Sequence, residues 1–295
     1  MGISAQVIKA LIQENEFKPI VGEFLSFGRQ TVNISKEKLY KLCESILTPD
    51  QIDALEIDQA TRHSDGKKIS DKSLLEALFK INYSTVDKSD YENPTFILDL
   101  TSTIPNSLDS KYDFIFSGGT LDNVFNPAQL IINASKLLRS GGRILHFEAA
   151  SRILGAYSFV TPEWFYSYYA VNNFTDVKVY LCHQSSPGEN RFDYNLDIYS
   201  YTPSFSRSEN FNHFNASLTH PGIQYLICIA EKGQSSSNEL VPHQLQYLDI
   251  NTINWPEKER IFNQSLRPLL SAKPSKILVE SPYLSDHFTF QGTGF

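Results

Sequence analysis

Residues 112–149 limit the possible folds of this chain more than any other stretch, because they hold a complete strand–helix–strand pattern. An apolar run at residues 112–116 has the aromatic and β-branched side chains typical of a strand buried on both faces. At residues 126–138, apolar side chains recur at helical spacing behind an Asn-Pro start. We expect Gly141 and Gly142 to end this helix, and a second apolar run follows at residues 143–147. Such a unit builds a parallel sheet with a right-handed connection.

Similar patterns continue on both sides of this unit. Further strands are predicted at residues 20–27, 83–86, 94–100, 176–182 and 223–231. Helices are predicted at residues 3–14, 35–47 and 70–80, with a polar loop or partial lid at residues 50–70. Together with the central unit, these patterns give seven strands. The sequence therefore predicts an α/β protein with a doubly wound, Rossmann-like and mostly parallel sheet.

The residues that follow each strand are the candidate binding residues, because ligands of such sheets lie outside the carboxyl ends of the strands. Gly28, Arg29 and Gln30 follow the first strand. A glycine in this position either lets a cofactor approach the backbone or simply forms a turn. We treat all three residues as candidate cofactor contacts.

An acidic residue, Asp87, stands at the end of the second strand. In Rossmann-like folds an acidic side chain at this place accepts hydrogen bonds from ribose hydroxyls. The distance in sequence from Gly28 exceeds the usual spacing of about 20 residues, so this role requires residues 35–66 to be an insertion. Asp90 or Glu92 are alternatives, and the other interpretation of Asp87 is an exposed loop carboxylate.

The third and fourth strands bring further residues to the same edge of the sheet. Asp99 and Leu100 end the third strand, where Asp99 either faces a ligand or caps the next turn. Ser117, Gly118 and Gly119 end the fourth strand, and glycine there lets a ligand approach the backbone. The convergence of four strand ends on one crevice is a stronger argument than any single residue.

Two titratable residues, His146 and Glu148, belong to the fifth strand and are the candidate catalytic residues. His146 lies inside the strand, where a histidine is more often part of the core. We expect Glu148 to lie nearer the rim, which makes it the better candidate for orienting a substrate.

Composition excludes several classes of protein. A net charge of −7 without clustered lysine and arginine argues against a nucleic-acid-binding face. No run approaches the roughly 20 consecutive apolar residues of a membrane span, and no secretion signal precedes the first helix. Cys43, Cys182 and Cys228 are widely spaced, so we expect buried thiols and a cytoplasmic location. We find no metal-ligand spacing and no phosphate-binding P-loop.

The run GTLDNVFNPAQLIINASKLLRSGGRIL, residues 119–145, resembles the fourth strand, helix and fifth strand of class I S-adenosylmethionine-dependent methyltransferases. The segment SFVTPEWFYSYYAVNNF, residues 158–174, is similar to a Ser-Pro-Glu-x-Phe segment of methyltransferase-like proteins found among sugar and secondary-metabolite genes. The resemblance covers roughly residues 20–232. It implies an antiparallel final hairpin, adenine near Asp99 and Leu100, and the methionine portion of the cofactor near Ser117, Gly118 and Gly119.

The chain departs from this family at three places. Only Gly28 matches the Gly-x-Gly-x-Gly motif after the first strand, and Gln30 replaces its second glycine. Asp122 and Asn123 replace a Glu-His pair, and Ala156 stands where related sequences carry a histidine. The cofactor interpretation therefore requires that neither Arg29 nor a neighbouring side chain fills the hollow, and that Asp87 faces it.

The predicted organisation is one methyltransferase-like domain, residues 1–232, followed by an extension, residues 233–295. Residues 35–70 and 183–221 are possible lid or cover insertions, and the extension is expected to dock on the domain or on a second copy of the chain. The leading hypothesis is S-adenosylmethionine-dependent methyl transfer to an oxygen or nitrogen of a small molecule in secondary metabolism, such as a sugar, a natural product or an amine. The alternatives are a catalytically silent binding or scaffold protein and, with less support, a nicotinamide enzyme.

Overall fold

A computed structural model describes residues 2–151, 155–184, 196–203, 223–243, 254–265 and 288–293 of the chain. His213 and His220, in the predicted cover insertion, lie outside these ranges. None of the helices in the described part is long and apolar enough to cross a membrane. Cys43, Cys182 and Cys228 are buried free thiols, as predicted.

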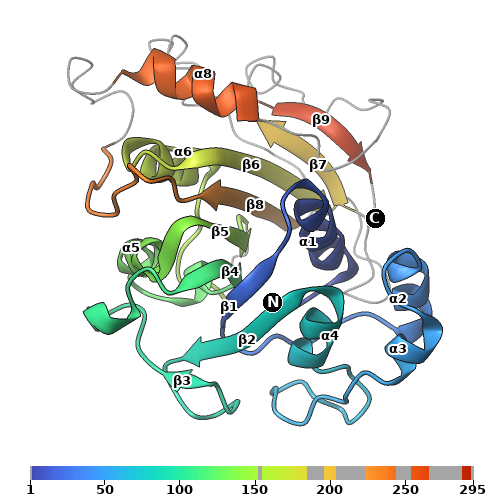
Figure 1. Cartoon of the computed structure of the whole chain (residues 1–295). Coiled ribbons are helices and arrows are strands. Elements are labelled where there is room, and N and C mark those ends of the chain that lie inside the picture. The colour runs from blue at the N-terminus through green and yellow to red at the C-terminus, as the bar shows by residue number, and fades with distance from the viewer. Residues whose placement is uncertain are drawn as a thin grey trace.

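The described strands form one sheet in the order β3-β2-β1-β4-β5-β8-β6-β7-β9 (Figure 1). They are β1 (Val21–Phe27), β2 (Lys80–Asp87), β3 (Phe96–Ile97), β4 (Tyr112–Gly118), β5 (Leu138–Ala149), β6 (Thr175–Gln184), β7 (Leu196–Tyr201), β8 (Ile223–Glu231) and β9 (Phe288–Thr293). Strands β1 to β5 are parallel to one another, and β8 lies antiparallel between β5 and β6. The doubly wound, mostly parallel architecture and its antiparallel last pair are therefore confirmed.

The predicted number of strands is wrong, because the sheet has nine strands and not seven. Strand β7 arises within the expected cover insertion and pairs with β6, whereas β9 arises within the extension and pairs with β7. Aromatic side chains join these two strands, since the rings of Tyr199 and Phe290 lie 5.2 Å apart. The third strand is shorter than predicted and contains only Phe96–Ile97.

Helices cover both faces of the sheet (Figure 1). They are α1 (Ala5–Phe17), α2 (Lys36–Cys43), α3 (Pro49–Asp53), α4 (Asp71–Leu78), α5 (Pro127–Leu137), α6 (Pro162–Val171) and α8 (Trp255–Ser265), with 3-10 turns η1 (Asn106–Leu108) and η2 (Leu121–Asn123). Apolar side chains of α1 to α4 share one core with Phe24, Phe114 and Phe147. Apolar side chains of α5, α6 and α8 share a second core with Ile115 and Ile144. Successive side chains of a strand point to opposite faces of the sheet, so each strand can contribute to both cores.

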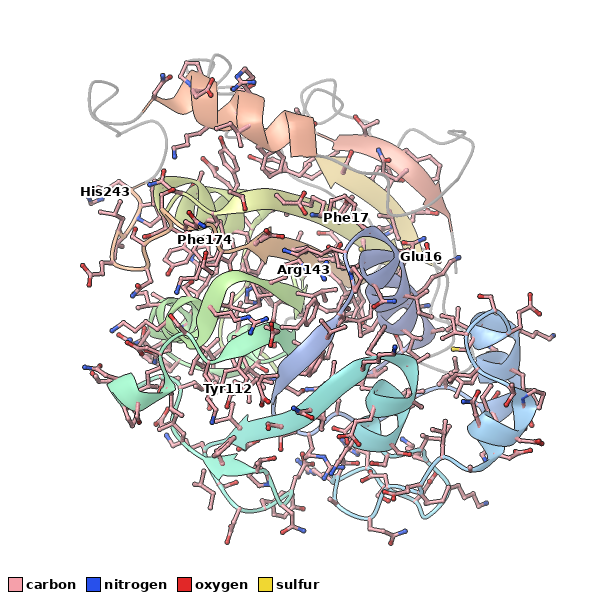
Figure 2. The ribbon with its side chains drawn as sticks, viewed as in Figure 1. Glu16, Phe17, Tyr112, Arg143, Phe174 and His243 are labelled. Atoms are coloured by element: carbon pink, nitrogen blue, oxygen red, sulfur yellow. The ribbon has the colours of Figure 1, made fainter. Side chains whose placement is uncertain are left out.

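The N-terminal helix is attached to the sheet through a buried arginine. Arg143 of β5 is 2% exposed, and its Nη1 donates to Glu14 Oε1 over 2.6 Å. Its Nη2 also donates to the carbonyl oxygen of Pro19 over 3.2 Å. Figure 2 shows Arg143 close to the end of α1, where Glu16 and Phe17 lie. Because both charged partners are buried, this ion pair fixes the position of α1.

The helix predicted at residues 35–47 is shorter than expected, because α2 ends at Cys43, and a separate helix, α3, occupies Pro49–Asp53 at the start of the predicted polar loop. Thr48 starts α3, since its hydroxyl accepts from Gln51 N while the Gln51 side chain accepts from Thr48 N. Pro49 occupies the first turn, where its missing N–H has no cost. We expected residues 48–50 to close the helix before them, whereas they form the capped start of α3.

Gly141 and Gly142 do not end α5, which stops at Leu137. Leu138 is already extended and pairs with Tyr112, and the register between β4 and β5 then shifts. Gly141 has φ +79°, and a Cβ on Gly142 would lie 2.9 Å from the carbonyl oxygen of Tyr112. The two glycines therefore serve an irregularity inside β5, and the predicted helix stop is wrong.

Candidate functional site

A cavity of about 600 Å³ lies at the carboxyl ends of β1, β2 and β4. Its wall is formed by the chain segments 27–30, 86–88, 98–101, 118–120 and 123–125, together with Leu130 and Tyr157. Strands β1 and β4 are neighbours here although they are distant in the sequence, so this is the switch point of the sheet (Figure 1). Cavities of this size hold small molecules and cofactors. All the predicted cofactor residues except Ser117 line it.

Asp87 and Gly28 form the junction between β2 and β1. Gly28 has φ +72°, and its N–H donates to the carbonyl oxygen of Val86 over 2.8 Å. Asp87 Oδ2 lies 3.4 Å from the position that a Cβ on Gly28 would take. Asp87 Oδ1 accepts from Ser89 N over 3.2 Å. The structure thus places this carboxylate on the cavity wall beside the turn after β1.

The two alternative carboxylates, Asp90 and Glu92, are not among the residues that line the cavity. Glu92 Oε1 instead accepts a hydrogen bond from Arg62 N over 2.6 Å. Asp87 is therefore the only one of the three acidic side chains considered that a ligand in this cavity would meet.

Arg29 is held by Asp71, the first residue of α4. Its Nη2 lies 2.6 Å from Asp71 Oδ1 and its Nε lies 2.9 Å from the same oxygen. Asp71 is 0% exposed and also accepts from Gln30 N and from the Tyr83 hydroxyl, each over 2.7 Å. The Asp58 carboxylate lies 3.8 Å from Arg29 Nη2. This buried network fixes the turn after β1.

Gln30 lies between the ends of β1 and β4 and is 4% exposed. Its Nε2 donates to the carbonyl oxygen of Phe27 over 3.0 Å, which fixes the orientation of the amide. Its Oε1 is buried and has no donor among the described residues. A Cβ on Gly118 would come within 2.7 Å of this oxygen. A glycine at the end of β4 therefore makes room for the Gln30 side chain.

Asp99 shows both features that its place in the sequence suggested. It lines the cavity, and it caps the following turn through bonds from Thr101 Oγ1 over 2.6 Å and from Thr101 N over 2.9 Å. Lys88 Nζ lies 2.9 Å from its other oxygen. The Thr101 hydroxyl and Lys88 lower the pKa of Asp99 to about 2, so it is ionised at neutral pH. Leu100, beside it, is anchored because its carbonyl oxygen accepts from Asn133 Nδ2 over 2.8 Å.

Ser117, His146 and Glu148 lie below the cavity and do not line it. All three are 0% exposed. Ser117 Oγ donates to Glu148 Oε1 over 2.6 Å, and Glu148 Oε2 accepts from Leu121 N over 3.1 Å. Burial raises the pKa of Glu148 to about 8. The expected position of Glu148 near the rim is wrong, because the loop after β4 folds over this end of β5.

His146 is packed against α6. Its Nε2 lies 2.7 Å from the Tyr169 hydroxyl, and its ring centroid is 4.9 Å from that of Phe165. Its Nδ1 is 3.9 Å from Glu148 Oε1. Burial lowers the pKa of His146 to about 3, so the imidazole is neutral. These contacts are those of a core histidine, and a ligand in the cavity does not reach it.

Several residues of the site were not predicted. Asn123, Val124 and Phe125 line the cavity, and Tyr157, which the sequence shows only as part of an aromatic stretch, joins them. Asp71 was expected only to lie at the start of a helix. Sequence patterns report periodicity and turns, and they carry no signal for contacts between distant loops.

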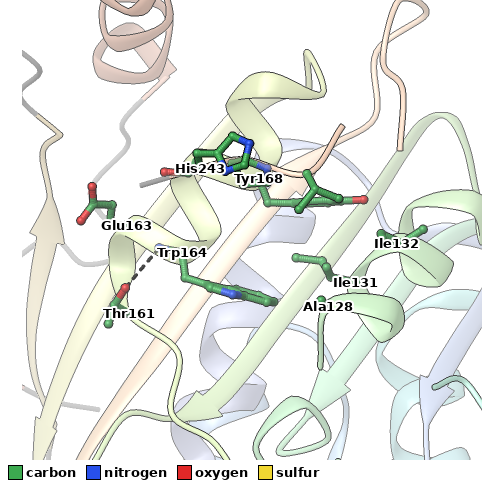
Figure 3. A pocket seen from close by; sticks show the side chains of 11 residues that line it. Ala128, Ile131, Ile132, Thr161, Glu163, Trp164, Tyr168 and His243 are labelled. Atoms are coloured by element: carbon green, nitrogen blue, oxygen red, sulfur yellow. Dashed lines mark hydrogen bonds between the residues drawn. The ribbon is translucent and has the colours of Figure 1, made fainter. Parts of the chain in front are cut away.

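A second cavity, of about 410 Å³, lies between α5 and α6 and the chain at residues 241–243 (Figure 3). Its lining is mainly apolar, and Figure 3 shows the Trp164 ring directed towards Ala128 and Ile131. Burial raises the pKa of Glu163 at its edge. This cavity shares no lining residue with the main cavity.

No known protein-family model matches this sequence, and no curated protein matches it. Among solved structures, phosphoethanolamine N-methyltransferase 2 of Haemonchus contortus, in complex with S-adenosyl-L-methionine, matches with a TM-score of 0.39 and 12% identity over 77% of this chain and 53% of that chain. A methyltransferase of Archaeoglobus fulgidus matches with a TM-score of 0.40 and 14% identity over 78% of this chain and 95% of that chain. A proposed Zn-dependent alcohol dehydrogenase of Rhodobacter sphaeroides matches with a TM-score of 0.28 and 13% identity over 48% of this chain and 46% of that chain. The chain spans about half the length of the Haemonchus protein.

Proposed function

We propose that this chain is an S-adenosylmethionine-dependent methyltransferase that acts on an oxygen or nitrogen atom of a small molecule. The observation that carries this proposal is the meeting of the ends of β1, β2 and β4, and of residues 98–101, on one cavity at the switch point. Asp87 lies on the wall of that cavity beside Gly28. This is the place where Rossmann-like folds bind the ribose of an adenosine-containing cofactor.

The residues present fit this cofactor. Asp87 would accept from the ribose hydroxyls, and Asp99 and Leu100 would lie near the adenine. Gln30, Gly118 and Gly119 would hold the methionine portion. The buried Gln30 Oε1, which has no donor among the described residues, suits an ammonium or another N–H donor. The missing second glycine does not argue against binding, since Gly118 offsets the volume of Gln30.

The chemistry requires little covalent help from the chain. The cofactor supplies a methyl group on a positively charged sulfur, which keeps the electron pair of the broken carbon–sulfur bond when the acceptor's heteroatom takes the methyl carbon. The protein has to align the acceptor, since alignment of the reacting atoms carries most of the rate. A base is needed only for an acceptor that holds its proton tightly. No histidine is among the described residues that line the cavity, and its two carboxylates, Asp87 and Asp99, are assigned to the cofactor in this proposal, so we assign proton release to water.

Glu148 has a supporting role in this proposal. Its two oxygens hold Ser117 and Leu121, the residues on either side of the segment 118–120 that lines the cavity. We therefore assign Glu148 as a positioning residue and His146 as a core residue.

The second candidate is a binding protein that has kept the fold without the reaction. The residue pair that replaces Glu-His favours it, because Asp122 is 1% exposed and only Asn123 lines the cavity. A fold alone does not decide between catalysis and binding.

Thermal-shift titration with S-adenosylmethionine, S-adenosylhomocysteine and NAD separates these functions. We expect both adenosyl compounds to stabilise the protein by about 2.7 kcal/mol at a concentration of about 100 Kd. Asp87→Ala should abolish the shift, whereas the control Asp90→Ala, an exposed neighbour outside the cavity, should retain it. No thermal shift with either adenosyl compound, or a shift with NAD alone, would overturn the proposal. Binding without methylation of any acceptor would favour the silent protein.

A further inference from the structure

Two aromatic side chains stand exposed at one end of the main cavity. Phe125 is 91% exposed and Tyr157 is 75% exposed, although both line the cavity. Their rings meet edge to face, with centroids 6.2 Å apart and planes at 77°. A single exposed aromatic side chain is ordinary, but two in mutual contact at a cavity are typical of a binding surface.

The loops that carry these two rings are tied together. Tyr157 N donates to the backbone oxygen of Asp122 over 2.7 Å, and Ser158 Oγ donates to that of Leu121 over 3.4 Å. Leu121 N in turn donates to the buried Glu148 carboxyl. The loop after β4 is therefore joined by hydrogen bonds to Tyr157 and Ser158. Such preorganisation lowers the entropy that a ligand would lose by ordering its site.

Charge divides the cavity into two ends. The charged side chains that line it, Arg29, Asp87, Lys88 and Asp99, come from the ends of β1 and β2 and from the chain after β3. The described lining residues that follow β4 and β5 carry no charge. We call Asn123, Val124, Phe125 and Tyr157 the aromatic end. The strand order places it opposite Asp87 and Asp99, so a cofactor over β2 and β1 would leave it for the acceptor.

The aromatic end carries two polar side-chain groups, the Asn123 amide and the Tyr157 hydroxyl. Asn123 Nδ2 donates to the backbone oxygen of Gly119, which leaves the amide oxygen as the free end of this side chain. No donor to that oxygen occurs among the described residues. An amide oxygen accepts from an N–H or O–H group. The aromatic end thus offers two aromatic rings and only two polar groups, the Asn123 amide and the Tyr157 hydroxyl, whereas a sugar requires several polar partners.

We propose that the aromatic end binds a flat aromatic ring carrying a hydroxyl or amino group, with Phe125 and Tyr157 against the ring and Asn123 accepting from its substituent. The inference that this ring is the methyl acceptor rests on the proposed function. The inference that a ring binds here rests on the two exposed aromatic side chains and on the division of charge.

Ligand-observed NMR with 2-naphthol tests this site, with 2-decalol as the saturated analogue and glucose as the sugar. We expect 2-naphthol to bind the full chain, and 2-decalol and glucose to bind at least about tenfold more weakly. Phe125→Ala and Tyr157→Ala should each weaken 2-naphthol binding by about three- to tenfold, the usual range for one aromatic contact. Both side chains are exposed, so both variants should fold. Tyr91→Ala is the matched control, because Tyr91 is 71% exposed and outside the cavity.

The outcomes separate this inference from the proposed function. Equal binding of 2-naphthol to Phe125→Ala and to the unmodified chain, or tighter binding of glucose, overturns the aromatic site. If S-adenosylhomocysteine still stabilises that same protein, the methyltransferase proposal survives. Binding of 2-naphthol without any response to S-adenosylhomocysteine supports the site and removes the methyltransferase proposal. If Phe125→Ala leaves 2-naphthol binding intact but dissociates a dimer in sedimentation, the surface is an interface between copies.

Discussion

Asp87 Oδ2 lies 3.4 Å from the position that a Cβ on Gly28 would take. The two residues end neighbouring parallel strands, β2 and β1, so the carboxylate and the turn form one corner of the main cavity. In the proposed function, this pair would do much of what a glycine-rich turn does, because it combines close approach to the backbone with a hydrogen-bond acceptor at the same place.

Gly28→Ala should weaken binding of S-adenosylhomocysteine and also lower stability. Gly28 has φ +72°, a conformation that costs a residue with a Cβ roughly 1–2 kcal/mol. Gly66→Ala is the matched control, since Gly66 has φ +74° and nothing lies within 4 Å of a Cβ added there. Urea unfolding should show similar losses for both variants, whereas calorimetry should show weaker binding for Gly28→Ala alone. Equal affinity of the two variants would separate Gly28 from the binding site.

Asp71→Asn should destabilise the protein strongly. The carboxylate is 0% exposed and holds Arg29, Gln30 N and the Tyr83 hydroxyl. Breaking a buried ion pair leaves an uncompensated charge, at a cost of roughly 3–5 kcal/mol. Lys36→Ala, which removes an exposed partner of Asp53, should cost less than about 1 kcal/mol. Free energies of unfolding in urea measure both. A loss below about 1 kcal/mol for Asp71→Asn would show that this network does not fix the turn.

The contribution of Glu148 to the stability of the protein should fall as pH rises from about 4.5 through 8. Its pKa is about 8 when folded and near the ordinary 4.5 when unfolded, so the folded protein keeps a proton that the unfolded chain releases between these values. The contribution of this proton to stability is therefore lost as pH rises from 4.5 through 8. Between pH 6 and pH 8 the expected loss is roughly 2–3 kcal/mol.

Glu148→Gln tests this dependence, because the amide has the same shape and does not titrate. Unfolding free energies at pH 6 and pH 8 should differ much less in the variant than in the unmodified chain. Glu257→Gln serves as the control, since Glu257 is exposed and Arg260 lowers its pKa. If the unfolding free energy of Glu148→Gln changes with pH as much as that of the unmodified chain, the buried carboxyl is not the source of the pH dependence.

His146 should produce the opposite trend at low pH. Burial lowers its pKa from 6.5 to about 3 in the folded state, so the unfolded chain binds a proton that the folded protein excludes. Stability is therefore lost as pH falls below about 6.5 towards 3. His146→Gln should reduce this loss, measured by urea unfolding at pH 6.5 and pH 4.5. If His146→Gln loses as much stability between pH 6.5 and pH 4.5 as the unmodified chain, His146 is not the source of this loss.

The strand–helix–strand unit was predictable because its signals are local: β-branched and aromatic residues in β4, helical spacing in α5 and an apolar run in β5. The same reasoning placed Gly28, Asp87, Asp99 and Gly118 on one cavity, since parallel strands end at one edge. It did not predict β7 and β9, whose pairing is between distant parts of the chain. Nor did it place Glu148, which is covered because a loop from another strand folds over it. The close approach of the Gln30 side chain to Gly118 is likewise a contact between distant residues, and sequence periodicity does not predict it.

Calorimetric titration of S-adenosylhomocysteine into the unmodified chain and into Asp87→Asn measures whether Asp87 binds the cofactor. We expect one-to-one binding to the unmodified chain. We expect the affinity to fall about ten- to a hundredfold in Asp87→Asn, because hydrogen bonds to a charged acceptor contribute roughly 1.5–3 kcal/mol. No binding to the folded unmodified chain, or equal affinity in an equally stable Asp87→Asn, would contradict this expectation.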